Sequence, residues 1–295
     1  MTHPLITWEN DRPEGLREPV LFVALEGWID AGFGAQSAVG TLKGQIRTER
    51  LVSFDTDELI DMRARRPSMT LVNGVNMGLK WPRLQIRHGR DRAGQDILVL
   101  TGPEPDHKWK GFLAALMEVV EQLNVRLCVG FGAFPAPTPH TRPVTLGATA
   151  TTAELAGQDG FIEASFEIPA GIQAAIERAF AEVDKPAVGI WARVPHYTAA
   201  MPYPGAAAAI LDCAARLTGL VIDTEDLRRA GAQAIGQIEG LVANNPEHVE
   251  MVRQLEQQVD SEVNLRAGQP GPIDLGNLPS ADELAAEFEQ FLRDQ

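Results

Sequence analysis

Two alternating patterns of apolar residues run through the N-terminal three quarters of the chain. Short unbroken apolar runs predict strands buried on both faces, and apolar residues every three or four positions predict helices. The predicted strands are 20–25, 51–54, 97–100, 126–131, 144–146 and 187–191, and the predicted helices are 33–46, 109–123, 170–183 and 205–217. Strands alternating with helices predict an α/β domain with a mostly parallel sheet covered on both faces.

From residue 225 onward the pattern is helical only. The apolar stripes of two predicted helices are Leu227, Ala234, Ile238 and Leu241, then Val249, Val252, Leu255, Val259 and Val263. Asn245 is expected to cap the second helix, with Pro246 in its first position. The short connection predicts an antiparallel helical hairpin, whose apolar stripe must pack on the body or on another subunit.

A Gly/Pro linker at 268–272 follows this pair of helices. Ser280 and Glu283 form a capping box, which predicts a final helix over 281–293. We therefore divide the chain into an α/β core domain, 1–222, and a helical extension, 223–295.

Charge separates the same two parts. The 295-residue chain has a net charge of −14, and residues 223–295 hold 15 acidic and 5 basic side chains, so most of the imbalance lies there. An acidic chain is not expected to bind nucleic acid or an anionic membrane. Two cysteines exclude a disulfide framework or a four-cysteine zinc site. Without a secretory signal pattern or a membrane-spanning apolar window, the expected location is cytoplasmic.

Ligands of open α/β sheets bind at the carboxyl ends of the strands, where two predicted loops carry acidic residues. Residues 27–34 resemble a nucleotide-binding loop, although Ser37 replaces the third glycine; the alternative is a tight turn with Asp30 as helix N-cap. In residues 102–109, Glu104 and Asp106 are either paired carboxylates for proton transfer or part of a stiff turn. In the second case Asp106 caps the helix that starts near Lys108.

Two further loops carry histidines. The proline-rich loop 135–143 holds His140 and Arg142, which could bind an anion, move a proton or anchor the loop by hydrogen bonds. The loop after residue 194 holds His196 and Tyr197, and the two histidines could converge.

No histidine has metal-ligand spacing, and the sequence lacks a phosphate loop and a nucleophile elbow. We therefore assign no catalytic residue, metal or cofactor. Cys128 and Cys213 are expected to be core thiols. The basic cluster Arg63, Arg65 and Arg66 is either a solvated face or a patch that pairs with carboxylates across a subunit contact.

Five motifs occur in register along the chain. They are Gly27-Trp28-x-Asp30-Ala31-Gly32; Phe54-Asp55-x-Asp57-Glu58-x-x-Asp61-x-Arg63-x-x-Arg66-Pro67; Gly102-Pro103-Glu104-Pro105-x-x-x-Trp109; Pro139-His140-Thr141-Arg142-Pro143-Val144; and Val194-Pro195-His196-Tyr197. Together they resemble the proteasome assembly chaperone 2 family, in its actinobacterial branch. The resemblance includes the tail, through the segments 252–256, 278–280 and 291–293.

The resemblance implies a phosphorylase/hydrolase-like three-layer α/β/α fold and a homo-oligomer, for example a trimer. It also implies a role like that of relatives that assist assembly of the 20S proteasome core without established catalysis. Proteasome-binding relatives often end in a hydrophobic residue, Tyr and any residue, whereas this chain ends Leu292-Arg293-Asp294-Gln295.

Two functions follow as hypotheses. The first is a non-enzymatic oligomeric protein that assists protein complex assembly, with itself and proteasome core subunits as partners. The alternative is an enzyme or small-ligand binder of the nucleoside-phosphorylase type, with Asp30, His140, Arg142 and His196 around one cleft.

Overall fold

The computed structural model describes residues 2–9, 15–157, 161–162 and 167–268. The strands are β1 (Ile6–Trp8), β2 (Val20–Glu26), β3 (Glu49–Phe54), β4 (Ser68–Val72), β5 (Val75–Lys80), β6 (Gln85–Arg90), β7 (Asp96–Pro103), β8 (Leu127–Ala136), β9 (Leu146–Ala150), β10 (Phe161–Ile162) and β11 (Ala187–Pro195). The helices are α1 (Gly34–Gln45), α2 (Thr56–Leu59), α3 (Trp109–Gln122), α4 (Ala153–Ala156), α5 (Ile172–Ala181), α6 (Pro204–Thr218), α7 (Glu225–Ala243) and α8 (Pro246–Gly268), with short 3₁₀ turns η1 (Ala31–Phe33) and η2 (His196–Thr198).

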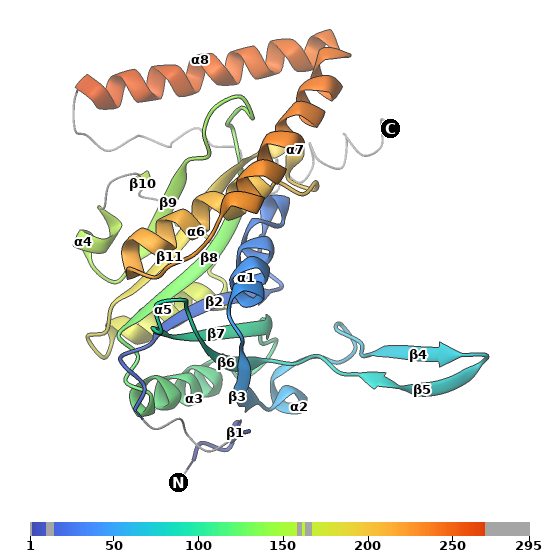
Figure 1. Ribbon diagram of the computed structural model, residues 1–295, viewed down its shortest axis with the longest axis vertical. Helices are drawn as coiled ribbons and strands as arrows, with labels where there is room; N and C mark the ends of the chain where they lie inside the picture. Colours follow the sequence, from blue (N-terminus) through green and yellow to red (C-terminus); the bar gives the residue numbers. More distant parts are fainter. Residues whose placement is uncertain (1, 10–14, 158–160, 163–166, 269–295) are drawn as a thin grey trace.

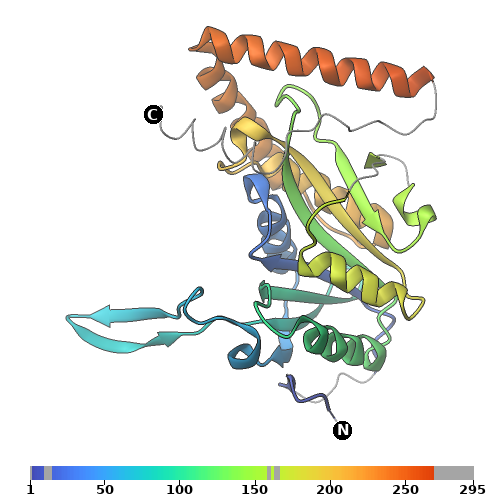
Figure 2. The same ribbon diagram turned by 180° about the vertical axis from the view of Figure 1, so that it is seen from behind.

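A nine-stranded sheet forms the middle layer, in the order β1-β3-β6-β7-β2-β8-β11-β9-β10. Its centre, β7-β2-β8-β11, is parallel, while β1, β3 and β6 pair antiparallel with their neighbours. Strand β9 is antiparallel to β11 and parallel to β10. Helices α1 and α6 cover one face and α3 and α5 cover the other (Figures 1 and 2). The predicted α/β class, with helices on both faces and a helical C-terminal part, is confirmed.

The unbroken apolar run of β2 explains why both faces need cover. Val20, Phe22 and Ala24 join the core under α1 and α6, whereas Leu21 and Val23 join the core under α3 and α5. All five side chains are buried, because successive side chains of a strand point to opposite faces. The expected core thiols Cys128 and Cys213 are likewise buried and free.

The described tail begins as the sequence predicts but folds differently. Asn245 caps α8 through its Oδ1, which accepts the N–H of Glu247 at 2.9 Å. Helix α7 lies against α6, where Gly231 approaches the backbone of Gly205. Helix α8 runs back from the end of α7, as in a helical hairpin, but diverges from it and crosses above the end of the sheet (Figure 1). The linker beyond Gly268, the capping box and the final helix lie outside the described residues.

A long β-hairpin, which we call the arm, was not predicted. It consists of β4 and β5 (residues 68–80), leaves the sheet between β3 and β6, and projects away from the body (Figures 1 and 2). Asn73 and Gly74 form its turn with φ of 50° and 82°, the two positive values of a type I′ hairpin. Every residue of both strands is exposed.

One carboxyl group lies inside the body between α5 and the sheet. Glu177 is 9% exposed, and its Oε1 accepts a hydrogen bond from the Thr149 hydroxyl at 2.9 Å. The absence of a side chain at Gly189 makes this room, since a Cβ there would lie 2.5 Å from the same oxygen. Burial raises the pKa of Glu177 to about 7, against an ordinary value of 4.5.

This carboxyl predicts a pH-dependent stability. The folded chain holds the Glu177 proton more tightly than the unfolded chain does. The contribution of the protonated carboxyl to the free energy of unfolding is therefore complete below about pH 4.5 and is lost as the pH rises through about 7. Between pH 5 and 8 the free energy of unfolding should fall by on the order of 2 kcal/mol from this group. Denaturant titrations of Glu177→Gln should lack that component, while the exposed control Glu182→Gln should keep it. Equal pH slopes for both variants would contradict the assignment.

Candidate functional site

The four candidate loops follow β2, β7, β8 and β11, which are neighbours in the parallel centre of the sheet. Their carboxyl ends therefore meet at one edge, as expected for an open α/β sheet. The structure distributes the candidate side chains over this edge in two separate groups, with Asp30 apart from both.

Asp30 is a helix cap. Its two carboxylate oxygens accept the backbone N–H groups of Ala35 at 2.7 Å and Gln36 at 3.0 Å, at the start of α1. Burial raises its pKa, and these hydrogen bonds oppose that rise. The turn before α1 needs Gly32, whose φ is +63° and where a Cβ would lie 2.6 Å from the Tyr203 side chain. The first loop is thus the tight turn with an N-cap, the alternative to a nucleotide grip.

The first group surrounds Glu104. Its carboxylate accepts the N–H of Ile172 at the start of α5, and burial raises its pKa. The Arg65 guanidinium lies near Glu104 and donates a hydrogen bond to Asp106. The exposed ring of Trp28 lies against Gly171, next to Ile172.

Asp106 does not cap α3, so that expectation is wrong. Its Oδ2 accepts the N–H of Asp61 at 2.8 Å and its Oδ1 binds Arg65, and α3 has no side-chain cap. Partial burial acts to raise the pKa of Asp106, but these two hydrogen bonds outweigh it and lower that pKa. Of the basic cluster, Arg65 is engaged within the chain, while Arg63 and Arg66 are exposed.

The second group forms around Tyr197, where the two loop histidines converge. The Tyr197 hydroxyl accepts the N–H of His140 at 2.9 Å and lies 2.8 Å from Nδ1 of the same residue. The His196 ring packs edge-on against the Tyr197 ring at a centroid distance of 5.2 Å. Burial lowers the pKa of His140 and raises that of Tyr197 to about 12, so both groups are neutral at pH 7.

Arg142 joins this group to the tail. Its Nε and NH2 atoms donate to the two oxygens of Asp260 at 2.8 and 2.7 Å, and its NH1 donates to Glu256 at 3.1 Å. The Thr141 hydroxyl donates to Glu256 as well. A two-pronged guanidinium–carboxylate contact fixes orientation, so Arg142 holds α8 over the loop that carries His140.

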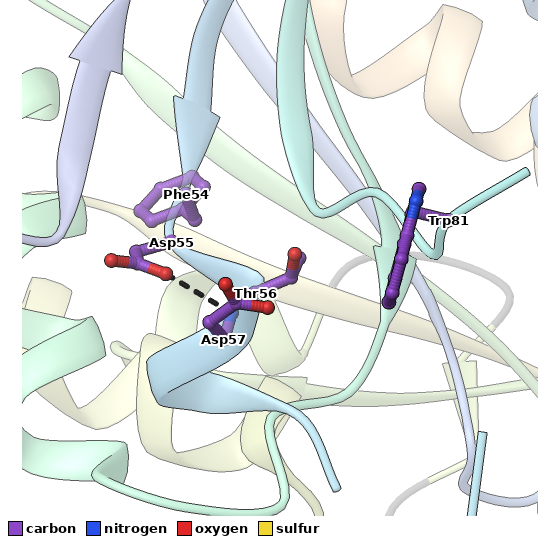
Figure 3. Close-up of a pocket in the computed structure, with 5 residues that line it drawn as sticks. All are labelled: Phe54, Asp55, Thr56, Asp57 and Trp81. Atoms are coloured by element: carbon purple, nitrogen blue, oxygen red, sulfur yellow. Dashed lines mark hydrogen bonds between the residues drawn. The ribbon is translucent and has the colours of Figure 1, made fainter. Parts of the chain in front are cut away.

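A hollow missed by the sequence analysis lies at the base of the arm. Phe54, Asp55, Thr56, Asp57 and Trp81 line it (Figure 3). Asp55 caps α2 by accepting the N–H groups of Asp57 and Glu58, and half of the Trp81 surface remains exposed. The spacing of Asp55 and Glu58 is a capping signal that could have indicated α2.

The geometry offers no assembled catalytic apparatus in the described part of the chain. No group of three His, Cys, Asp or Glu side chains among those residues could hold a metal ion. Asp30, Asp106 and Arg142 are bound to partners within the chain, and His140 is 1% exposed. None of the described helices is both long and apolar enough to cross a membrane. These features define an α/β protein whose loop edge is built for structure and whose apolar arm is exposed.

The chain belongs to the PAC2 family, whose match covers residues 24–242. Among solved structures, it is similar to Mycobacterium tuberculosis Rv2714, with 33% identity, a TM-score of 0.81, and coverage of 90% of this chain and 91% of that one. It is also similar to a protein of unknown function from Corynebacterium glutamicum ATCC 13032, with 29% identity, a TM-score of 0.82, and coverage of 88% and 98%.

A third similar structure carries a functional description. The Mycobacterium tuberculosis proteasome-assembly chaperone homologue Rv2125 is 34% identical, with a TM-score of 0.74 and coverage of 79% of this chain and 99% of that one. No curated protein matches the chain in sequence. The predicted family is therefore confirmed.

The contacts of Arg142 predict that it holds α8 in place. Because this arginine makes three of the hydrogen bonds between loop and helix, Arg142→Ala should speed amide exchange in residues 252–262 roughly fivefold. The matched control is Arg253→Ala, because Arg253 pairs with Glu250 within α8 itself. Equal protection of α8 in the two variants would show that Arg142 does not hold it.

Proposed function

We propose that this protein is a non-enzymatic homo-oligomer, with a trimer as the expected form, that assists the assembly of a protein complex in the cytoplasm. Its α/β core domain, 1–222, would provide the scaffold and its extension, 223–295, an acidic contact surface. The observation that carries the proposal is the arm, because it displays a large apolar surface that the described chain does not cover.

Six large apolar side chains stand on the arm. Met69, Leu71, Val72, Val75, Met77 and Leu79 are each between 45% and 63% exposed. An isolated two-stranded hairpin is marginal in water, and exposed apolar patches of this kind mark contact surfaces. Contact with another chain would stabilise the hairpin and would bury its apolar side chains.

The polar loop edge supports a role other than catalysis. The residues of the enzyme hypothesis each serve a structural partner: Asp30 caps α1, His140 and His196 pack on Tyr197, and Arg142 binds α8. Proton transfer requires a side chain within reach of a substrate, and burial of His140 opposes that use.

The proteasome core is the proposed client. The support is the similarity to a proteasome-assembly chaperone homologue at 34% identity.

The arm predicts the oligomeric state. Leu71→Asp with Val75→Asp places charges on its apolar surface and should raise the dissociation constant of the oligomer by at least about a hundredfold, measured as molar mass by light scattering over a dilution series. Asn73→Asp is the control, because it adds a charge in the turn of the arm, away from Leu71, and an Asp-Gly turn keeps the type I′ hairpin. An unchanged mass for the double variant would overturn the role of the arm.

If the proteasome core is the client, the protein should capture 20S subunits from cells. The tagged chain, expressed in cells that contain a proteasome, should enrich 20S α and β subunits as measured by quantitative mass spectrometry. The Leu71→Asp and Val75→Asp double variant should lose most of this enrichment, because the proposed oligomer depends on the arm, and Asn73→Asp should retain it. If 20S subunits are no more abundant with the native chain than with the tag alone, the proposed client is wrong.

A further inference from the structure

The arm combines its apolar surface with a strong local excess of positive charge. From Met62 to Arg90 the sequence has seven Lys and Arg residues and no Asp or Glu, in a chain whose net charge is −14. Arg63, Arg66, Lys80 and Arg83 at the base of the arm are exposed, and none forms an ion pair with a described residue. A complementary surface must therefore be both apolar and acidic.

The C-terminal segment of this same chain has that chemistry. Residues 281–293 contain four acidic side chains and one arginine. At helical spacing, Leu284, Phe288, Phe291 and Leu292 fall on one stripe, with Asp282, Glu283, Glu287 and Glu289 outside it. The capping box of Ser280 and Glu283 predicts that this helix starts just before the stripe.

The position of α8 favours a neighbouring copy as the source of this segment. Helix α8 ends on the side of the molecule opposite the arm (Figures 1 and 2). The intervening residues 269–280 span at most about 40 Å when fully extended, and they include Pro270, Pro272 and Pro279. A connection of limited length that starts on the side opposite the arm favours the arm of another copy over the chain's own arm.

From these observations we propose that the C-terminal segment 281–293 of a second copy of this chain docks on the arm, with its apolar stripe on Leu71, Met77 and Leu79 and its carboxylates facing Arg63 and Arg66. This inference rests on the proposed oligomer and names its contact. The contact joins two different surfaces, so three copies can close into a ring in which each segment docks on the arm of the next copy.

Removal of the segment tests the contact. A chain that ends at Asn277 should have the molar mass of one protomer at concentrations where the full chain is oligomeric. Phe288→Asp in the full chain should act in the same direction, whereas Gln290→Asp adds the same charge on the polar side of the predicted helix and should leave the mass unchanged.

The outcome separates this inference from the proposed function. If the shortened chain keeps the oligomer mass while the Leu71→Asp and Val75→Asp variant is monomeric, the arm makes the oligomer and the docking of the tail is wrong. If the double variant also keeps its mass, both proposals are wrong.

Cross-linking tests which copy supplies the segment. The native Cys128 and Cys213 are buried, so introduced cysteines can be oxidised selectively. Chains carrying only Leu71→Cys and chains carrying only Phe288→Cys, co-expressed with tags of different size, should form a mixed disulfide-linked dimer. A link found only within chains that carry both substitutions would show docking on the chain's own arm, and self-linking of Leu71→Cys alone would show contact between arms. Either result overturns the proposal.

Discussion

The rest of the fold depends on one constraint, which is that helices must cover both faces of the parallel centre of the sheet. The backbone and apolar side chains of β7, β2, β8 and β11 are removed from water only if helices lie above and below them. The chain therefore places α1 and α6 on one face and α3 and α5 on the other. Because the four strands are parallel, the loops that follow them lie at one edge, where polar residues distant in sequence become neighbours.

The polar side chains at that edge illustrate how a structural demand can imitate a catalytic one. Helix starts leave unpaired N–H groups, and Asp30 and Glu104 satisfy them at α1 and α5. The ring of His140 is held by Tyr197, and Arg142 is held by two carboxylates of α8. A loop rich in Asp, Glu, His and Arg has the same composition whether its side chains are structural or catalytic. Only the contacts of each side chain distinguish a helix cap or an ion pair from a reactive group.

The sequence predicted the elements whose apolar residues are buried, because burial imposes an unbroken run or a helical stripe, as in β2 and α3. It missed β6, where polar residues such as Arg87 and His88 alternate with the buried Ile86 and Gly89. It missed the arm, although Asn73-Gly74 between apolar residues is a hairpin signal. Both faces of the arm are exposed, so no buried face imposes an alternation of apolar and polar residues on its strands. The contact of Arg142 with Asp260 joins residues 118 positions apart, and local pattern carries no information about such a pair.

The distribution of charge explains why the core and the assembly can be specified separately. The buried centre holds few charges, so its stability depends on apolar cover and changes little with the surface. Positive charge gathers at the base of the arm and negative charge on the extension, where α8 already uses two carboxylates to bind Arg142. Like charges keep the acidic extensions of different copies apart, whereas opposite charges attract an extension to an arm. In the proposed contact, an apolar surface flanked by one sign of charge would disfavour pairing of like surfaces and favour pairing of the arm with an acidic extension.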